Sequence, residues 1–144
     1  MNKQKQMLKI LKDTRDYYAA DPDNRRSIDK DGSCKYTWGD THCAVGRYLK
    51  EENQRENWHS NSDSVNELCQ ESGEGWNIDW ALRDEVQGLD PDFWMNLQDF
   101  HDARSCWITE EDYNKDDEPI GLSRIGKDNY RVIERKINMG GYDG

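Results

Sequence analysis

A strongly patterned helix is encoded by DPDFWMNLQDFHD, residues 90–102. Asp90 can accept a hydrogen bond from a free amide of the first turn, and Pro91 suits that turn because its missing N–H would have no partner there. With about 100° between neighbours, three apolar side chains share one arc: Phe93, Leu97 and Phe100. Trp94 and His101 lie on the shoulder of this arc. The pattern predicts a helix over 90–102 that turns this arc and His101 into the core.

An inward histidine marks a candidate site, because a buried imidazole must find a hydrogen-bond partner, a metal or a ligand. Asp99 and Asp102 are expected to face water. Neighbouring residues of a helix point in different directions, so Asp102 is not expected to orient the His101 ring. Gln98, or a carboxylate from elsewhere in the chain, would have to do so.

The composition fits a single domain over residues 1–144 with one core. Charged residues make up 35% of the chain and hydrophobic residues 33%, but six Trp and seven Tyr supply large areas for burial, which argues against global disorder. The net charge of -10 repels nucleic acid and anionic membranes at long range. Such a surface suits a basic partner, or it serves solubility alone.

Outward from the 90–102 helix, the chain predicts a mainly α-helical domain of about five or six helices with a small β-hairpin near residues 33–45. An N-terminal helix is predicted over 3–19. The polar loop 22–33 follows it, so this helix is expected to be semi-detached and able to form a homo-oligomer with a second copy. Its apolar row is Met7, Leu11, Thr14 and Tyr18.

Three further helices are predicted from their capping residues. Thr41 can cap a helix that begins at His42 and continues into the charged residues 51–55. Ser64 and Glu67 form a capping box. Asn77 can cap a helix that ends near Gly88, with Ile78, Leu82, Val86 and Leu89 on one side.

The C-terminal segment 123–138 fits a helix that is capped by Ser123 and ended by Gly140 and Gly141. Its apolar stripe is Ile125, Val132, Ile133 and Ile137. The β-branched residues and Tyr130 leave a strand open as the alternative. Residues 109–118 are predicted to form an acidic loop.

Cys43 is the one candidate nucleophile. At the second position of a helix capped by Thr41, its thiolate would be stabilised by free amides and the helix dipole. Arg47 would add positive charge, and His101 could act as the base of a Cys/His pair. The alternative, which the sequence favours, is a small apolar side chain under the hairpin.

A ligand pocket is predicted between the start of the Cys43 helix and the His101 helix. Arg47 would meet an anion there, Trp38 would stack on the ligand, and His101 and Gln98 would form hydrogen bonds to it. The predicted binding residues are Trp38, His42, Cys43, Arg47, Gln98 and His101. Trp58 is a second stacking candidate, and Arg25 and Arg26 are further phosphate-binding candidates. The expected ligand is small, anionic and nucleotide-like.

Neither a cofactor nor a metal is expected. The cysteines form no CxxC pair, and their spacing to the histidines matches no standard zinc pattern. The apolar patch at residues 7–11 is too short for a signal-peptide core, and no apolar run reaches membrane-spanning length. We therefore expect a cytoplasmic protein with reduced thiols that binds neither membrane nor nucleic acid directly.

Three segments carry a resemblance. They are Cys-x-Tyr at 34–36 with Cys-Ala-Val-Gly-Arg-Tyr-Leu at 43–49, Leu-Gln-Asp-Phe-His-Asp at 97–102, and Gly-Leu-Ser-x-x-Gly at 121–126. Together they resemble a group of small uncharacterised bacteriophage and bacterial proteins with a Cys-Ala-Val-Gly helix start and a Leu-Gln-x-x-His-Asp helix. The resemblance spans about residues 32–137 and implies a helical domain of phage or mobile-element origin. It implies no activity.

The sequence favours a binding protein over an enzyme. The leading hypothesis is a phage accessory protein that inhibits a host defence protein or sequesters a small host signal in the host cytoplasm. The first alternative is a thiol-dependent hydrolase or transferase that uses Cys43 and His101. The second is an acidic DNA mimic.

Overall fold

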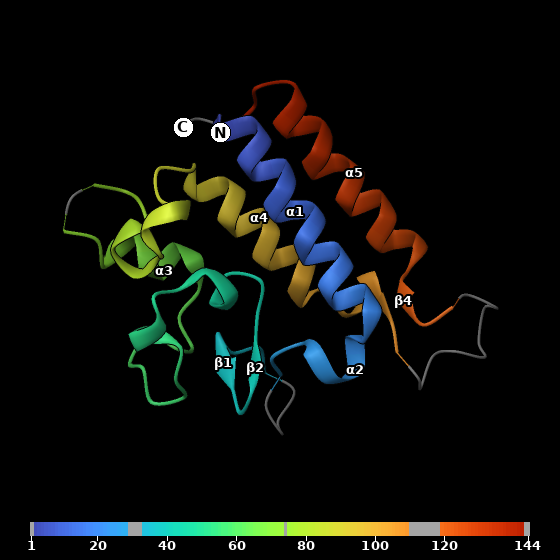
Figure 1. Ribbon diagram of the computed structural model, residues 1–144, viewed down its shortest axis with the longest axis horizontal. Helices are drawn as coiled ribbons and strands as arrows, with labels where there is room; N and C mark the ends of the chain where they lie inside the picture. The colour runs from blue at the N-terminus through green and yellow to red at the C-terminus, as the bar shows by residue number, and fades with distance from the viewer. Residues whose placement is uncertain (1, 29–32, 74, 110–118, 143–144) are drawn as a thin grey trace.

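Three long helices form the body of the molecule, and each contacts the other two (Figure 1). They are α1 (Lys3–Ala20), α4 (Pro91–Asp102) and α5 (Arg124–Asn138). The computed structural model describes residues 2–28, 33–73, 75–109 and 119–142. The predicted fold class, mainly α-helical with a small hairpin, is confirmed.

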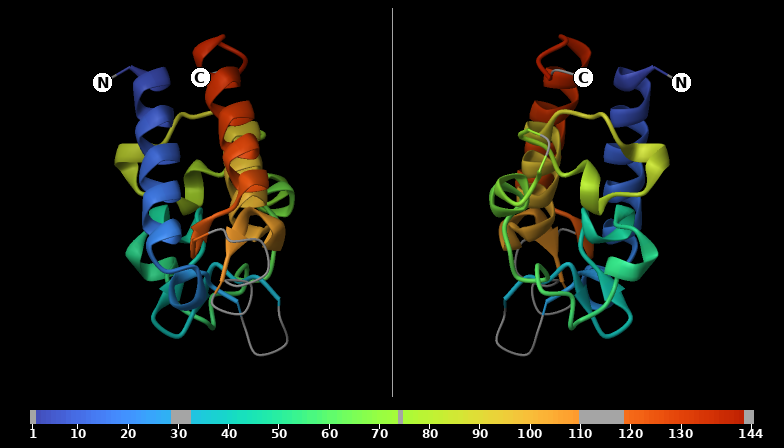
Figure 2. Two further views of the ribbon diagram at one scale, coloured as in Figure 1. Left: turned by 90° about the vertical axis from the view of Figure 1, so that its right-hand side faces the viewer. Right: turned by 90° about the vertical axis from the view of Figure 1, so that its left-hand side faces the viewer.

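Helix α1 is an integral part of this body. Its predicted row of Met7, Leu11, Thr14 and Tyr18 is buried, and the helix contacts both α4 and α5. Figure 2 shows it alongside α5 over its length. The segment after α1 is not simply a loop, because Asp21 caps a short helix, α2 (Pro22–Arg25). The 3–19 segment therefore packs as part of the core and not as a separate arm.

Helices α4 and α5 begin where their capping residues predict. The Asp92 N–H donates to Asp90 Oδ1 at 2.9 Å, and the Gly126 N–H donates to Ser123 Oγ at 2.9 Å. The helical interpretation of 123–138 is thus correct, and the strand alternative is not.

The predicted stripe of α5 is only half right. Ile133 and Ile137 are buried, but Ile125 is 53% and Val132 is 67% exposed. The reason is a close contact at Gly126, where a Cβ atom would lie only 2.2 Å from the Cys106 carbonyl oxygen. This contact presents the row that contains Gly126 to the core and turns the row of Ile125 and Val132 to water.

The hairpin is short, and the helix predicted from His42 does not form. Strands β1 (Thr37–Trp38) and β2 (Thr41–His42) pair antiparallel around a turn in which Gly39 has φ 59°. The Thr41 hydroxyl donates to the Trp38 carbonyl and caps no helix. The Cys43 N–H continues the pairing by donating to the Tyr36 carbonyl at 3.1 Å, so helical geometry starts only at η1 (Gly46–Tyr48). A second 3₁₀ turn, η2 (Glu51–Asn53), follows.

The predicted capping box of Ser64 and Glu67 is confirmed at the start of α3 (Val65–Gln70). The helix predicted after Asn77 is replaced by two 3₁₀ turns, η3 (Asp79–Ala81) and η4 (Asp84–Val86). Leu82 forms a bridge with Leu49 between these turns, so its backbone bonds are used across the fold and not along a helix. The predicted apolar side chains are still buried: Ile78, Leu82, Val86 and Leu89.

A second small sheet precedes α5 and has no counterpart in the sequence prediction. The turn η5 (Arg104–Cys106) leads into β3 (Trp107–Ile108), which pairs antiparallel with β4 (Gly121–Leu122). Apart from Thr109, the predicted acidic loop 109–118 lies outside the described residues.

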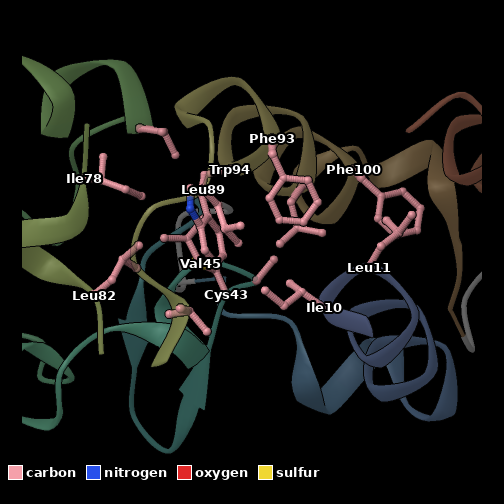
Figure 3. Close-up of a cluster of buried hydrophobic side chains, with 14 of the residues drawn as sticks. Ile10, Leu11, Cys43, Val45, Ile78, Leu82, Leu89, Phe93, Trp94 and Phe100 are labelled. Carbon is pink, nitrogen blue, oxygen red and sulfur yellow. The ribbon is translucent and has the colours of Figure 1, made fainter. Parts of the chain in front are cut away.

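The core is rich in aromatic side chains and gathers residues from α1, α4 and the connecting segments (Figure 3). Trp94 and Trp107 are almost fully buried, and Trp58 packs against Tyr36 and Trp80. Trp58, a stacking candidate in the sequence, is therefore a core residue. Among the described residues, none of the helices combines the length and the apolar character needed to cross a membrane.

Candidate ligand-binding site

His101 is turned inward as predicted, with 0% of its surface exposed. The prediction that Asp102 could not orient it is wrong, because His101 Nδ1 lies 2.7 Å from Asp102 Oδ1. Asp102 is the last residue of α4, and Gln98, one turn earlier, donates to the same carboxylate oxygen at 3.0 Å. Because Asp102 ends the helix and bonds to the Gln98 amide, its carboxylate turns toward the imidazole. The Asp102 side chain is therefore only partly exposed to water.

The His101 ring is neutral and fully buried. Burial lowers its pKa, against the opposing effect of Asp102. Since a carboxylate only accepts, the proton of the neutral ring is assigned to Nδ1. Nε2 is buried without a hydrogen-bond partner, and the Tyr18 ring meets the imidazole edge-on at 4.6 Å between centroids. The ring therefore orients Asp102 and is itself shielded from a ligand.

The two segments expected to frame a pocket do lie next to each other, but protein side chains join them directly. Gln98 Oε1 accepts the Val45 N–H at 3.1 Å. The Tyr18 hydroxyl donates to the His42 carbonyl while its ring covers His101. Gln98 and Tyr18 therefore bridge the two segments.

Cys43 is a core thiol. Its side chain is fully buried, it accepts a hydrogen bond from the Gly46 N–H at 3.2 Å, and burial raises its pKa well above the ordinary range. It leaves strand β2 and does not begin a helix, so the predicted stabilisation of a thiolate is missing. Reactive thiols are accessible and have lowered pKa values. Cys43 therefore fits the alternative interpretation of the sequence, in which it is a small apolar side chain under the hairpin.

Arg47 is the predicted residue that does reach an open cleft. Its guanidinium carbon lies 4.1 Å from the centre of the Tyr17 ring, with Tyr48 at 5.8 Å. Arg25 also stacks on Tyr17, at 4.5 Å. Arg47 Nη1 is shielded from solvent and has no hydrogen-bond partner, and within the described part of the chain Arg47 forms no ion pair. It is a cation held by aromatic rings without a counter-ion.

The cleft beside Arg47 has a volume of about 570 Å³ and lies between α1, η1 and η4. Lys9 and Arg83 add two positive charges to its wall, and Asp13 and Glu85 add two negative ones. Lys9 and Asp13 neutralise each other across 2.6 Å. The cations Arg47 and Arg83 therefore outweigh the one remaining acid. Its other lining residues are Gln6, Ile10, Tyr48 and Val86.

His42 lies close enough to Arg83 and Arg47 for their positive charges to affect its pKa. Burial lowers its pKa, and the charges of Arg83 and Arg47 lower it further. The ring is half-buried and lies 3.0 Å from the Thr37 hydroxyl. His42 is thus a neutral neighbour of the two guanidiniums.

The remaining predicted residues have other places. Trp38 is half-buried on β1 and is not among the residues that line the Arg47 cleft. Arg26, a phosphate-binding candidate in the sequence, is buried and donates to the carbonyls of His101 and Asp102, both at 3.1 Å. It caps the C-terminal end of α4.

Sequence reasoning missed Tyr17, Tyr48, Lys9 and Arg83 as members of one site. The only local signals were the Tyr17-Tyr18 pair and the Arg47-Tyr48 pair. Each pair is unremarkable alone, because the site exists only where α1 and η1 meet.

None of the four cysteines, all of which lie in the described ranges, forms a disulfide, and in these ranges no three His, Cys, Asp or Glu side chains converge in a way that could hold a metal. Comparisons of the chain with family models, with curated proteins and with solved structures found no match.

Proposed function

We propose that this is a non-enzymatic binding protein that holds a small anionic, nucleotide-like ligand in the cleft between α1 and η1. The observation that carries the proposal is Arg47, whose guanidinium is held against Tyr17 beside an open cleft and has no counter-ion among the described residues. A phosphate or carboxylate oxygen is the group that this arrangement lacks.

The energetic argument concerns Arg47 Nη1. A buried donor without an acceptor costs about 1–3 kcal/mol relative to a satisfied one. A ligand oxygen would remove that cost and gain a charge-assisted hydrogen bond. The ring of Tyr17 already holds the guanidinium in place, so less conformational entropy is lost when a ligand binds.

The overall charge limits the size of the anion. A protein with a net charge of -10 repels a polyanion such as DNA at long range, whereas a small anion meets mainly the local charges of the cleft. The cleft volume of about 570 Å³ suits a ligand of that size. Arg83, which donates to the Leu49 carbonyl at 3.1 Å, is a second fixed cation beside it.

The three segments that resemble phage and bacterial proteins support a biological setting for this binding. We place the protein in a bacterial host cytoplasm, as a phage accessory factor that sequesters a small host signal. Inhibition of a basic host protein by the acidic surface is the other form of the proposal, supported by the net charge of -10.

Calorimetric titration with inorganic phosphate, AMP and ATP tests the proposal. We expect the wild-type protein to bind at least one of these probes. Arg47→Met should weaken that binding about tenfold or more, because it removes a charged hydrogen-bond donor. Arg83→Gln, which changes an exposed side chain, should weaken it less and keep the fold.

The matched control is Arg131→Met, which removes an exposed arginine of α5 that lies outside the cleft. It should leave the affinity unchanged, and circular dichroism should show that all variants are folded. Equal affinities of wild type and Arg47→Met, or no binding of any probe at millimolar concentration, would refute the proposal.

A further inference from the structure

A second cleft, of about 370 Å³, lies against the C-terminal half of α4 and shares no lining residue with the Arg47 cleft. Its other walls are residues 34–36, which lead into the hairpin, and residues 61–67 at the start of α3. The resemblance segments contribute Cys34, Tyr36, Gln98 and Asp102 to it. The proposed function above uses none of these side chains.

The cleft is strongly acidic. Four carboxylates line it, together with one cation, Lys35. Within the described ranges, none of the four forms an ion pair with a Lys or Arg side chain. Burial raises the pKa of Asp99, and the charge of Asp102 raises it further. The four acids are Asp63, Glu67, Asp99 and Asp102.

Tyr36 provides an independent sign that a ligand belongs here. It lines the cleft but is only 3% exposed, and its hydroxyl has no hydrogen-bond partner. Burial is the largest cause that raises its pKa, and the negative charges of three cleft carboxylates, Asp102 first, also raise it. The hydroxyl therefore stays protonated beside these acids, with its acceptor lone pairs unused.

The Asp102 carboxylate is held in place as a hydrogen-bond acceptor. His101 Nδ1 and Gln98 Nε2 both bond to its Oδ1, and among the described residues Oδ2 has no partner. Since His101 is neutral and fully buried, it fixes the carboxylate without cancelling its charge. The buried imidazole thus positions an acceptor on the wall of a cleft.

The spacing of the four carboxylates indicates which class of cation the cleft could bind. Among the described residues the acids do not converge in the manner of a metal site. Val65 and Met95 also line the cleft and can contact methylene groups. A linear chain that carries separate ammonium groups matches both features, because each ammonium offers three donors and the chain between them is apolar.

We propose that this cleft binds an alkylammonium chain, with Asp102 Oδ2 and the Tyr36 hydroxyl as acceptors and Asp99 as a nearby countercharge. A free polyamine and a lysine side chain of a partner protein share this chemistry. The site is separate from the Arg47 cleft, so either binding proposal can be refuted without affecting the other.

Calorimetric titration of the full chain with spermidine, and with a lysine-rich peptide, tests the proposal. We expect spermidine to bind, and Asp102→Asn to weaken binding about tenfold or more, because a hydrogen bond to a charged group is lost. Tyr36→Phe should weaken it by a smaller factor. Asp99→Asn changes an exposed side chain, so it keeps the test valid should the Asp102 variant not fold.

The control variant is Asp128→Asn, which removes an exposed acid of α5 outside the cleft and should leave binding unchanged. Diacetylputrescine, whose amides are uncharged, should not bind. Tighter binding of spermidine supports a free polyamine, and tighter binding of the peptide supports a basic protein segment. The proposal is overturned if wild type binds neither cation, or if Asp128→Asn weakens binding as much as Asp99→Asn and Asp102→Asn do.

Discussion

His101 shows at the residue scale how a buried polar group can serve a site without touching a ligand. Its Nδ1 orients Asp102 at 2.7 Å, and the rest of the ring is enclosed by the core. Tyr18 covers the ring and also holds the His42 carbonyl. The histidine thus connects the core to the wall of the acidic cleft.

This burial predicts a pH dependence of stability. The pKa of His101 is lower in the folded protein than in the unfolded chain, because burial disfavours its charged form. The unfolded chain therefore takes up a proton first as the pH falls below about 6.5. The stabilisation is complete above that pH, and the free energy of unfolding should decrease on acidification, by up to about 1.4 kcal/mol per pH unit for one proton.

Urea unfolding at about pH 7.5, 6.5 and 5.5 measures this decrease around the ordinary histidine pKa. His101→Gln should reduce it. Some dependence should remain, because the pKa of His42 is also lowered. His59→Gln, at an exposed histidine, is the control and should behave as wild type. An unchanged slope in His101→Gln would show that the imidazole is not kept neutral by folding.

At the scale of elements, short loops and backbone contacts decide how the long helices meet. Arg26 and Trp107 both donate to the His101 carbonyl and so occupy the acceptors at the end of α4. Gly126 brings the first turn of α5 against η5. The helices are placed by these end contacts as well as by their apolar faces.

The Gly126 contact predicts a large effect for a single methyl group. A Cβ atom there would lie 2.2 Å from the Cys106 carbonyl oxygen and 2.5 Å from a Leu122 methyl carbon. Because the carbonyl is backbone, α5 or η5 would have to move, and overpacking of this kind costs about 1–3 kcal/mol. Gly126→Ala should lower the free energy of unfolding by that amount in urea titrations.

The matched control is Gly73→Ala, where a Cβ atom meets nothing within 4 Å. Its effect should be much smaller, since no contact opposes the methyl group. If the two variants proved equally stable, α5 would not approach η5 as closely as the structure places it.

At the scale of the whole molecule, the net charge of -10 coexists with two clefts of different character. Cations dominate the Arg47 cleft, and carboxylates dominate the cleft beside α4. The ion pairs Lys9–Asp13, Lys12–Asp16 and Arg131–Asp128 are exposed, so each contributes little stability. The chain as a whole therefore keeps an excess of ten negative charges. The homo-oligomer through residues 3–19 stays a prediction, although the apolar row of α1 is already buried in its own chain.

This excess charge predicts how stability responds to salt. Self-repulsion destabilises a compact acidic protein, and salt screens it. The free energy of unfolding, measured in urea, should rise as sodium chloride is increased from low to moderate concentration. A fall would mean that specific ion pairs, and not net repulsion, dominate the electrostatics of the fold.

The amino-acid sequence by itself determined the elements whose signals are local. Asp90, Ser64 and Ser123 mark helix starts correctly, because a cap bonds to amides two or three residues away. The inward position of His101 followed from helical periodicity alone. Periodicity likewise predicted the burial of the apolar residues between 78 and 89, although not their 3₁₀ turns.

Only the tertiary structure decided where backbone pairing overrides helical spacing. Cys43 pairs with Tyr36 and Leu82 bridges to Leu49, so both predicted helices fail there. The same holds for the two clefts, because Arg47 meets Tyr17, and Asp102 and Tyr36 come to line one cleft, only where distant segments pack together. Caps and periodicity act over a few residues, whereas pairing and binding sites depend on where the chain returns to itself.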